Sequence, residues 1–268
     1  GKHLVCASLP IVSAQVGKGP VNIAAWIRFA VSWPVNKHRG SGMAGFVWMT
    51  LGRGLGICLV FLALGCGMAL PAGAQNLLDH DQAIQALVDV EPSQRLTGML
   101  RLADIGTAAD ANAVLVLLRD ADPRLRQLAL PLVWELWSRS GDAAIDAQYQ
   151  QAMASMQAGE LPKAVQQFTA IITSRPAFAE AWNKRATLYF MQGQYELSMK
   201  DCEEVLTRIP LHFGALSGYA QMLAERGQPE RALQYLQRAY RVNPNMVNAS
   251  LMIEDLRRQI EIRRKQTT

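Results

Sequence analysis

Three prolines set a fixed repeat length in the second half of the chain. Pro176, Pro210 and Pro244 lie 34 residues apart. Three glycines keep the same step, each 17 residues before its proline: Gly159, Gly193 and Gly227. Proline interrupts helices, and glycine adopts the left-handed backbone that ends them. Two such markers recurring in phase indicate a repeated helical unit, so this part of the chain is expected to stack rather than to fold around one irregular core.

The units implied by this phase are 145–178, 179–212 and 213–246. Their pattern of small and large apolar residues resembles the tetratricopeptide repeat, a 34-residue pair of antiparallel helices. The second unit carries the pattern most fully, with Trp182, Ala186, Tyr189, Ser198, Val205 and Pro210. The third unit has Leu216, Ala220, Leu223, Ala232, Leu236, Ala239 and Pro244. In the first unit the second helix fits, with Ala164, Phe168, Ile171 and Pro176, whereas the first helix departs at Gln148, Gln151 and Ser155.

The segment before the repeats, residues 75–142, is expected to form further helices. Apolar spacing predicts helices over 76–90 and 110–118, and one between them that Ser93 caps. The next stretch resembles a HEAT repeat through these residues: Asp120, Asp122, Pro123, Leu125, Arg126 and Ala129. Asp122 would cap its helix, Pro123 would occupy the first turn, and Arg126 would reach acidic groups in the loop.

Two tryptophans follow in that helix. Trp134 and Trp137, three residues apart, form an apolar stripe with Leu130 and Val133. We interpret the stripe as core packing, with an aromatic ligand site as the alternative.

The whole chain is therefore predicted to be all-α: an α-α superhelical solenoid. Residues 75–142 form its HEAT-like helices, 143–246 its three tetratricopeptide repeats, and 247–268 a capping helix. Ala249, Met252, Leu256 and Ile260 would cover the open end of the stack. The HEAT-like helices and the repeats are expected to form one continuous solenoid.

The N-terminal part has the layout of an export signal. Residues 55–70 are apolar and follow Arg53, and Ala72 and Ala74 form an A-x-A cleavage site before Gln75. We expect residues 49–74 to be a cleaved signal peptide, which places the protein in the periplasm or outside the cell. The alternative is a membrane anchor formed by residues 55–70, although the run is short for a span. Residues 1–48 are expected to be upstream sequence included by a wrong start site, or a disordered extension.

The net charge of +5 gives no support for a nucleic-acid partner. All 22 acidic residues lie at Asp79 or later, and six of the 27 basic residues lie before it. The rest of the chain therefore carries 21 basic against 22 acidic residues, which is close to neutral. We expect no nucleic-acid partner, and membrane contact only through an uncleaved signal segment.

The resemblance implies a binding surface on the first helices of the repeats. In this family their exposed positions line a concave groove that takes a protein or peptide. The matching positions here are Tyr149, Met153, Met156, Asn183, Lys184, Thr187, Phe190, Ser217 and Gln221. The lysine and asparagine clamp that some members use for C-terminal carboxylates is not reproduced beyond Asn183 and Lys184. Gly214 and Gly218 make the third unit shallow, so that a bulky side chain could sit there.

The sequence shows no constellation of catalytic or metal-binding residues. Past the leader, His80 and His212 lie far apart and Cys202 stands alone. No metal-ligand spacing or nucleophile motif is present. We expect no catalysis, cofactor or metal, and a scaffold or adaptor whose partner is a protein or peptide. The alternative is a cell-envelope hydrolase or enzyme subunit that uses the Trp134 and Trp137 region.

Overall fold

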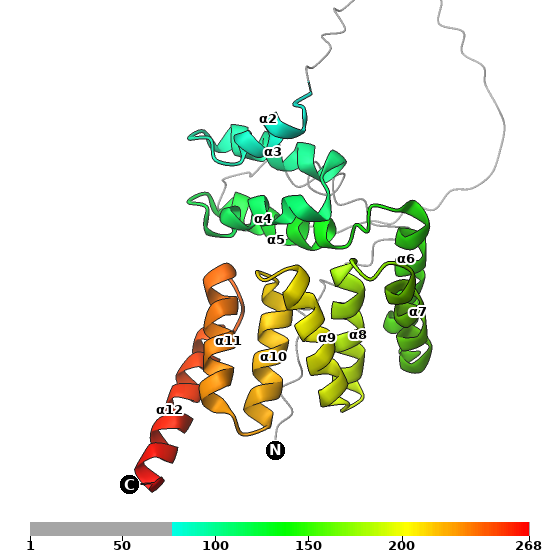
Figure 1. The fold of residues 1–268 in the computed structure, drawn as a ribbon. Helices are drawn as coiled ribbons and strands as arrows, with labels where there is room; N and C mark the ends of the chain where they lie inside the picture. Colours follow the sequence, from blue (N-terminus) through cyan, green and yellow to red (C-terminus); the bar gives the residue numbers. More distant parts are fainter. Residues whose placement is uncertain (1–76, 268) are drawn as a thin grey trace, which may run out of the picture.

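The computed structural model describes residues 77–267, and this part of the chain is all-α, as the sequence predicts. Figure 1 shows the helices of the second and third repeats side by side in one row, with the first pair beside it. The three antiparallel pairs and the final helix are α6 (Ala143–Gln157) with α7 (Leu161–Ser174), α8 (Ala179–Met191) with α9 (Tyr195–Arg208), α10 (Phe213–Glu225) with α11 (Pro229–Val242), and α12 (Ala249–Thr267).

The turns inside the repeats confirm the role of the in-phase glycines. Gly159, Gly193 and Gly227 have φ angles of 77°, 73° and 71°. An L side chain is strained in this left-handed region, whereas glycine enters it at little cost. Each glycine ends the first helix of its pair and allows the second to return antiparallel.

The helices before the repeats form a separate layer, and their boundaries differ from the prediction. Ser93 lies inside the first turn of its helix, because Pro92 already occupies a helical N-terminal position that suits proline. The helix expected over 110–118 is broken into 3₁₀ and α-helical turns. The layer consists of α2 (His80–Ala86), α3 (Pro92–Ile105), η1 (Ala108–Asp110), α4 (Ala111–Val114), η2 (Leu115–Arg119) and α5 (Pro123–Trp137).

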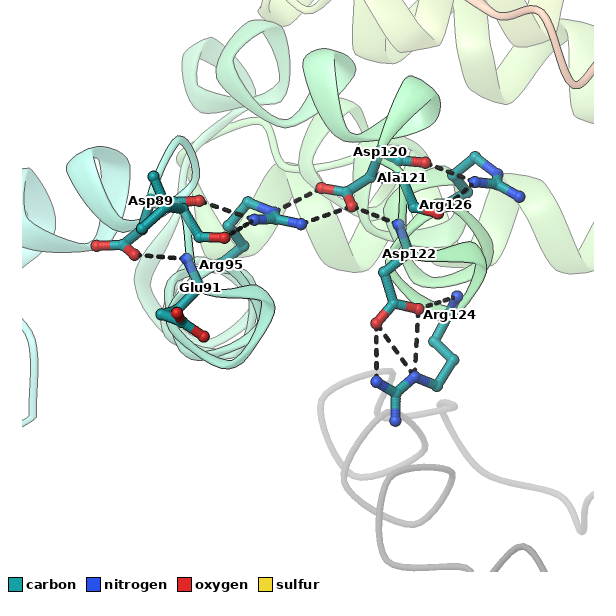
Figure 2. Close-up of polar contacts among 9 residues, drawn as sticks. Asp89, Glu91, Arg95, Asp120, Ala121, Asp122, Arg124 and Arg126 are labelled. Atoms are coloured by element: carbon teal, nitrogen blue, oxygen red, sulfur yellow. Dashed lines mark hydrogen bonds and ion pairs between the residues drawn. The ribbon is translucent and has the colours of Figure 1, made fainter.

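The turn before α5 is built differently from the expectation for Arg126. Asp122 does cap α5, accepting a hydrogen bond of 2.8 Å from the backbone N–H of Arg124. Arg126, however, donates to the backbone carbonyl oxygens of Asp120 and Ala121, not to acidic side chains. The carboxylate of Asp120 is held instead by Arg95 of α3 (Figure 2). The loop is therefore tied to α3 as well as to its own helix.

The layer α2–α5 is stacked against the ends of the repeat helices, which the prediction of one continuous solenoid did not anticipate (Figure 1). One hydrophobic core runs from Leu102 and Leu132 of the layer to Phe213, Leu216 and Ala239 of the third repeat. Two side chains that donate to backbone carbonyls also join the layer to the third repeat. The Asn245 amide donates to the Leu118 carbonyl at 2.6 Å, and the Arg119 guanidinium donates to the Arg241 carbonyl. The layer thus folds back onto the third repeat.

The final helix covers the end of the stack. Ala249, Ile253, Leu256 and Ile260 of α12 are buried. Met252, which the prediction placed in this set, is 37% exposed, because Ile253 is the residue one turn after Ala249 on the packed face. None of the helices within residues 77–267 is long and apolar enough to span a bilayer. The expected signal segment, with residues 55–70, Ala72, Ala74 and Gln75, lies outside the described residues.

Candidate protein-binding groove

The first helices of the three repeats present equivalent positions in rows of 34-residue spacing. The row at Tyr149, Asn183 and Ser217 is the first. The next row along the helices contains Met153, Thr187 and Gln221, and the last contains Met156, Phe190 and Ala224. Helices α5 and α6 are joined beside the first row, where Ser138 and Tyr149 hydroxyl oxygens lie 3.4 Å apart.

The indole of Trp134 from α5 fills the shallow part of the third repeat. A Cβ atom on Gly214 would lie only 2.7 Å from Cη2 of Trp134. The same indole makes edge contacts with the rings of His212 and Phe213, at centroid distances of 5.4 and 5.1 Å. The ammonium of Lys184 lies 5.3 Å from the Trp134 ring centroid. The bulky side chain expected beside Gly214 is therefore supplied by the chain itself.

Trp137 packs deeper in the same junction. Its side chain is 1% exposed, and its ring stacks on the imidazole of His212 with centroids 4.2 Å apart. Trp134 meets Trp137 edge-on at 5.3 Å. Aromatic pairs in such geometries add to the stabilisation that area burial provides. The two tryptophans join the N-terminal layer to the repeats, which favours the interpretation of core packing.

A buried carboxylate lies beneath this aromatic junction. Glu180 of α8 is fully buried, and Oε1 accepts a 2.8 Å ion pair from Nζ of Lys184. Its Oε2 lies 3.1 Å from Nε2 of His212, whose Nδ1 accepts from the backbone N–H of Ala215. The amide of Asn183 donates to both carboxylate oxygens. All these partners belong to the second and third repeats, so the network links two adjacent units.

Charge pairing sets the protonation state of Glu180. Burial by itself raises the pKa of this carboxyl, since it disfavours the charged form. The adjacent Lys184 ammonium and the hydrogen bond to His212 act in the opposite direction and prevail, lowering the pKa to about 2. Glu180 is thus an anion at neutral pH, and Lys184 serves as its counter-charge.

Three of the predicted groove residues lie in this junction rather than on an open surface. Tyr149 is 3% exposed, and its ring packs against Phe168 and Phe178. Asn183 is 8% exposed and is used by Glu180. The expectation that these two positions are exposed is wrong, because aromatic rings pack on Tyr149 and the amide of Asn183 bonds the buried Glu180. Lys184 retains a side-chain exposure of 21%, but it is paired with Glu180.

The remaining predicted positions stay partly exposed on α6, α8 and α10: Met153, Met156, Thr187, Phe190, Ser217 and Gln221. The ring of Phe190 packs against the ring of Tyr195, at a centroid distance of 5.5 Å. Sequence reasoning missed Ala224, which is partly exposed and lies one repeat after Phe190. The 34-residue step was the signal that could have identified it. We call the partly exposed second and third rows the open half of the predicted groove.

Two further features of the described chain concern possible metal ligands and pockets. Within residues 77–267 no group of three His, Cys, Asp or Glu side chains is placed to hold a metal ion. A shallow pocket of about 350 Å³ lies between α11 and α12, away from the repeat groove. Its lining is mainly polar and consists of Glu230, Leu233, Gln234, Gln237, Arg257, Ile260, Glu261 and Arg264.

Comparisons with known proteins agree with the repeat phase. The tetratricopeptide repeat family model matches residues 149–210 and 200–247. A TPR repeat-containing protein of Rhizobium etli (strain ATCC 51251) is 39% identical over 108 residues, which are 40% of this chain and 53% of the relative. The chain therefore spans about half the length of this curated relative.

Two solved structures are similar at low sequence identity. The first TPR of Spaghetti (RPAP3), bound to HSP90 peptide SRMEEVD, is 15% identical with a TM-score of 0.42, and the match covers 44% of this chain and 93% of that one. MamA is 15% identical with a TM-score of 0.36, covering 57% of this chain and 94% of that one.

Paired helices stacked at a constant step define an α-helical repeat protein. The family match and the Rhizobium relative specify the kind of repeat: the chain is a tetratricopeptide repeat protein over residues 149–247. Repeats of this family generally mediate protein–protein interaction, and proteins of this fold are typically scaffolds without catalytic activity.

Proposed function

We propose that this chain is an exported adaptor that binds a protein segment in the open half of the repeat groove and catalyses no reaction of its own. The observation that carries the proposal is the division of the groove. Tyr149 and Asn183 of the first row are buried, whereas the second and third rows remain partly exposed on α6, α8 and α10.

The chemistry of the open half favours a segment with apolar side chains. Met153, Met156 and Phe190 supply flexible and aromatic surface, and methionine adapts to irregular partner shapes. Thr187 and Gln221 add hydrogen-bonding groups between them. An amphipathic helix of one or two turns, or an extended peptide of similar length, suits such a strip. The covered first row leaves no lysine and asparagine pair free to bind a terminal carboxylate, since both serve Glu180.

Capture of partners from envelope extract tests the surface. Thr187→Arg with Gln221→Arg places two long charged side chains in the open half without touching the buried junction. We expect this variant to lose the proteins that the wild-type chain retains. Gln166→Arg, an exposed position on α7, is the matched control and should retain them. Equal capture by all three proteins would contradict the proposed surface.

Export is tested separately by N-terminal sequencing of the protein recovered outside the cytoplasm. Cleavage after Ala74 predicts a mature chain that begins at Gln75. A mature product that still contains residue 60 would contradict signal cleavage and favour anchoring by residues 55–70.

A further inference from the structure

The outward face of the final helix carries a pattern unlike that of a simple end cap. The packed face of α12 consists of Ala249, Ile253, Leu256 and Ile260. The opposite face is defined by four residues at helical spacing: Leu251, Asp255, Arg258 and Ile262. Terminal helices of repeat stacks normally present polar outer faces, which keep them soluble. Leu251 and Ile262, however, are 62% and 50% exposed.

This outward face is complementary to itself when reversed. Positions 251 and 262, and likewise 255 and 258, are equally distant from the midpoint between residues 256 and 257. An antiparallel second α12 in this register would set Leu251 against Ile262 and Asp255 against Arg258, each contact occurring twice. Such a two-fold contact is isologous, the arrangement found in most homodimers. In this one register, each side of the axis carries one apolar pair and one pair of opposite charges.

We propose that α12 binds α12 of a second copy of this chain, antiparallel, about a two-fold axis between residues 256 and 257. Figure 1 shows α12 at the end of the row of repeat helices, where no other helix of the described chain lies beyond it. Within one chain, Asp255 and Arg258 already approach to 3.8 Å. Pairing two copies would join these side chains into a ring of four alternating charges.

The proposed contact is small, so the dimer is expected to be weak. Leu251 and Ile262 are 11 residues apart, or about 16 Å along the helix axis. A strip of this length buries less than the roughly 800 Å² per partner of a standard stable interface. We therefore expect a weak, reversible dimer that forms only at high protein concentration. This inference does not depend on the proposed groove function, because α12 contributes no residue to the groove.

Charge reversal tests the register directly by analytical ultracentrifugation of the full 268-residue chain. Asp255→Arg gives a helix with two positive charges on this face, and Arg258→Asp gives one with two negative charges. Each variant alone should dimerise at least about tenfold more weakly than the wild-type chain, because like charges then meet across the axis. An equimolar mixture of the two variants should dimerise again, as should the double variant, in which the charges are exchanged.

Arg257→Asp is the matched control, since Arg257 lies on the same helix beside the pocket toward α11 and away from the proposed face. It should associate like the wild-type chain. A wild-type chain that stays monomeric at all concentrations would overturn the proposal. So would an association that is equally strong in both single variants, because that result would place the contact on another part of the chain.

Discussion

Trp134 and Gly214, 80 positions apart in sequence, lie so close that a Cβ atom on the glycine would sit 2.7 Å from the indole. The absence of a side chain at position 214 lets α5 rest against the start of α10. The contact explains how a layer of helices that precedes the repeats reaches the third repeat. The indole also fills the space beside Gly214 that the sequence had left for a bulky side chain.

Gly214→Ala should destabilise the protein. The added methyl group requires the Trp134 ring to move within a packed aromatic cluster, which costs about 1–3 kcal/mol. The gain in helix propensity from glycine to alanine, up to about 1 kcal/mol, offsets part of this loss. Urea unfolding measures the difference.

Gly218→Ala is the control for this prediction. It lies one turn later in α10, and a Cβ there would meet nothing within 4 Å. Helix propensity should then dominate and stabilise the protein by up to about 1 kcal/mol. Equal effects at both positions would show that α5 does not press on Gly214.

Local patterns predicted the repeats well, because helix pairing within a unit depends on residues close in sequence. The in-phase glycines and prolines defined the helix ends, and the small residues Ala186 and Ala220 lie buried between helices as their positions implied. The capping role of Asp122 followed from the same kind of local geometry.

Long-range docking could not be predicted in the same way. The sequence showed that Gly214 leaves a shallow site, but no periodicity relates it to Trp134. Tyr149 and Asn183 occupy groove positions by register, yet both are buried, Tyr149 against Phe168 and Phe178 and Asn183 beside Glu180. The assignment of Arg126 failed for a similar reason, since the partner of Asp120 comes from another helix 25 residues earlier.

Removing the counter-charge of Glu180 should lower the free energy of unfolding by a measurable amount. Lys184→Met leaves a buried carboxylate without its ion pair, which costs about 3 kcal/mol in such pairs. Lys200→Met, at an exposed position on α9, should change stability by less than about 0.5 kcal/mol. Chemical denaturation compares the two. Indistinguishable stabilities would show that Lys184 does not hold Glu180.

The same carboxylate makes the free energy of unfolding depend on pH in the acidic range. Its folded-state pKa of about 2 lies below the ordinary value of 4.5. The group therefore stabilises the fold above pH 4.5, and this contribution decreases as the pH falls from 4.5 toward 2. The stability difference between the wild-type chain and Glu180→Gln should shrink over this interval. A difference that stays constant from pH 5 to pH 2.5 would contradict the charge pairing.

We expect Arg95 to provide the main side-chain link between α3 and the loop before α5. Its Nε and Nη2 atoms donate to the two Asp120 oxygens at 2.6 and 2.8 Å, and Nη1 donates to the carbonyls of Asp89 and Val90. Arg95→Ala leaves the Asp120 carboxylate, 5% exposed, without its charge partner. The loss should be about 3 kcal/mol in thermal or urea unfolding.

Arg124 provides the comparison in the same loop. It pairs with Asp122, but its side chain is 80% exposed, so its ion pair is solvated. Arg124→Ala should cost less than about 1 kcal/mol. A larger loss for Arg124→Ala than for Arg95→Ala would refute the assignment of Arg95 as the structural partner.

Site-specific photo-cross-linking in living cells tests whether the open half of the groove binds a protein. A photoreactive amino acid would replace Thr187, Gln221 or, as a control, Gln166 on α7. We expect a covalent adduct with the same protein from positions 187 and 221, and none from position 166. Adducts from position 166 alone, or the absence of adducts from both groove positions, would contradict it.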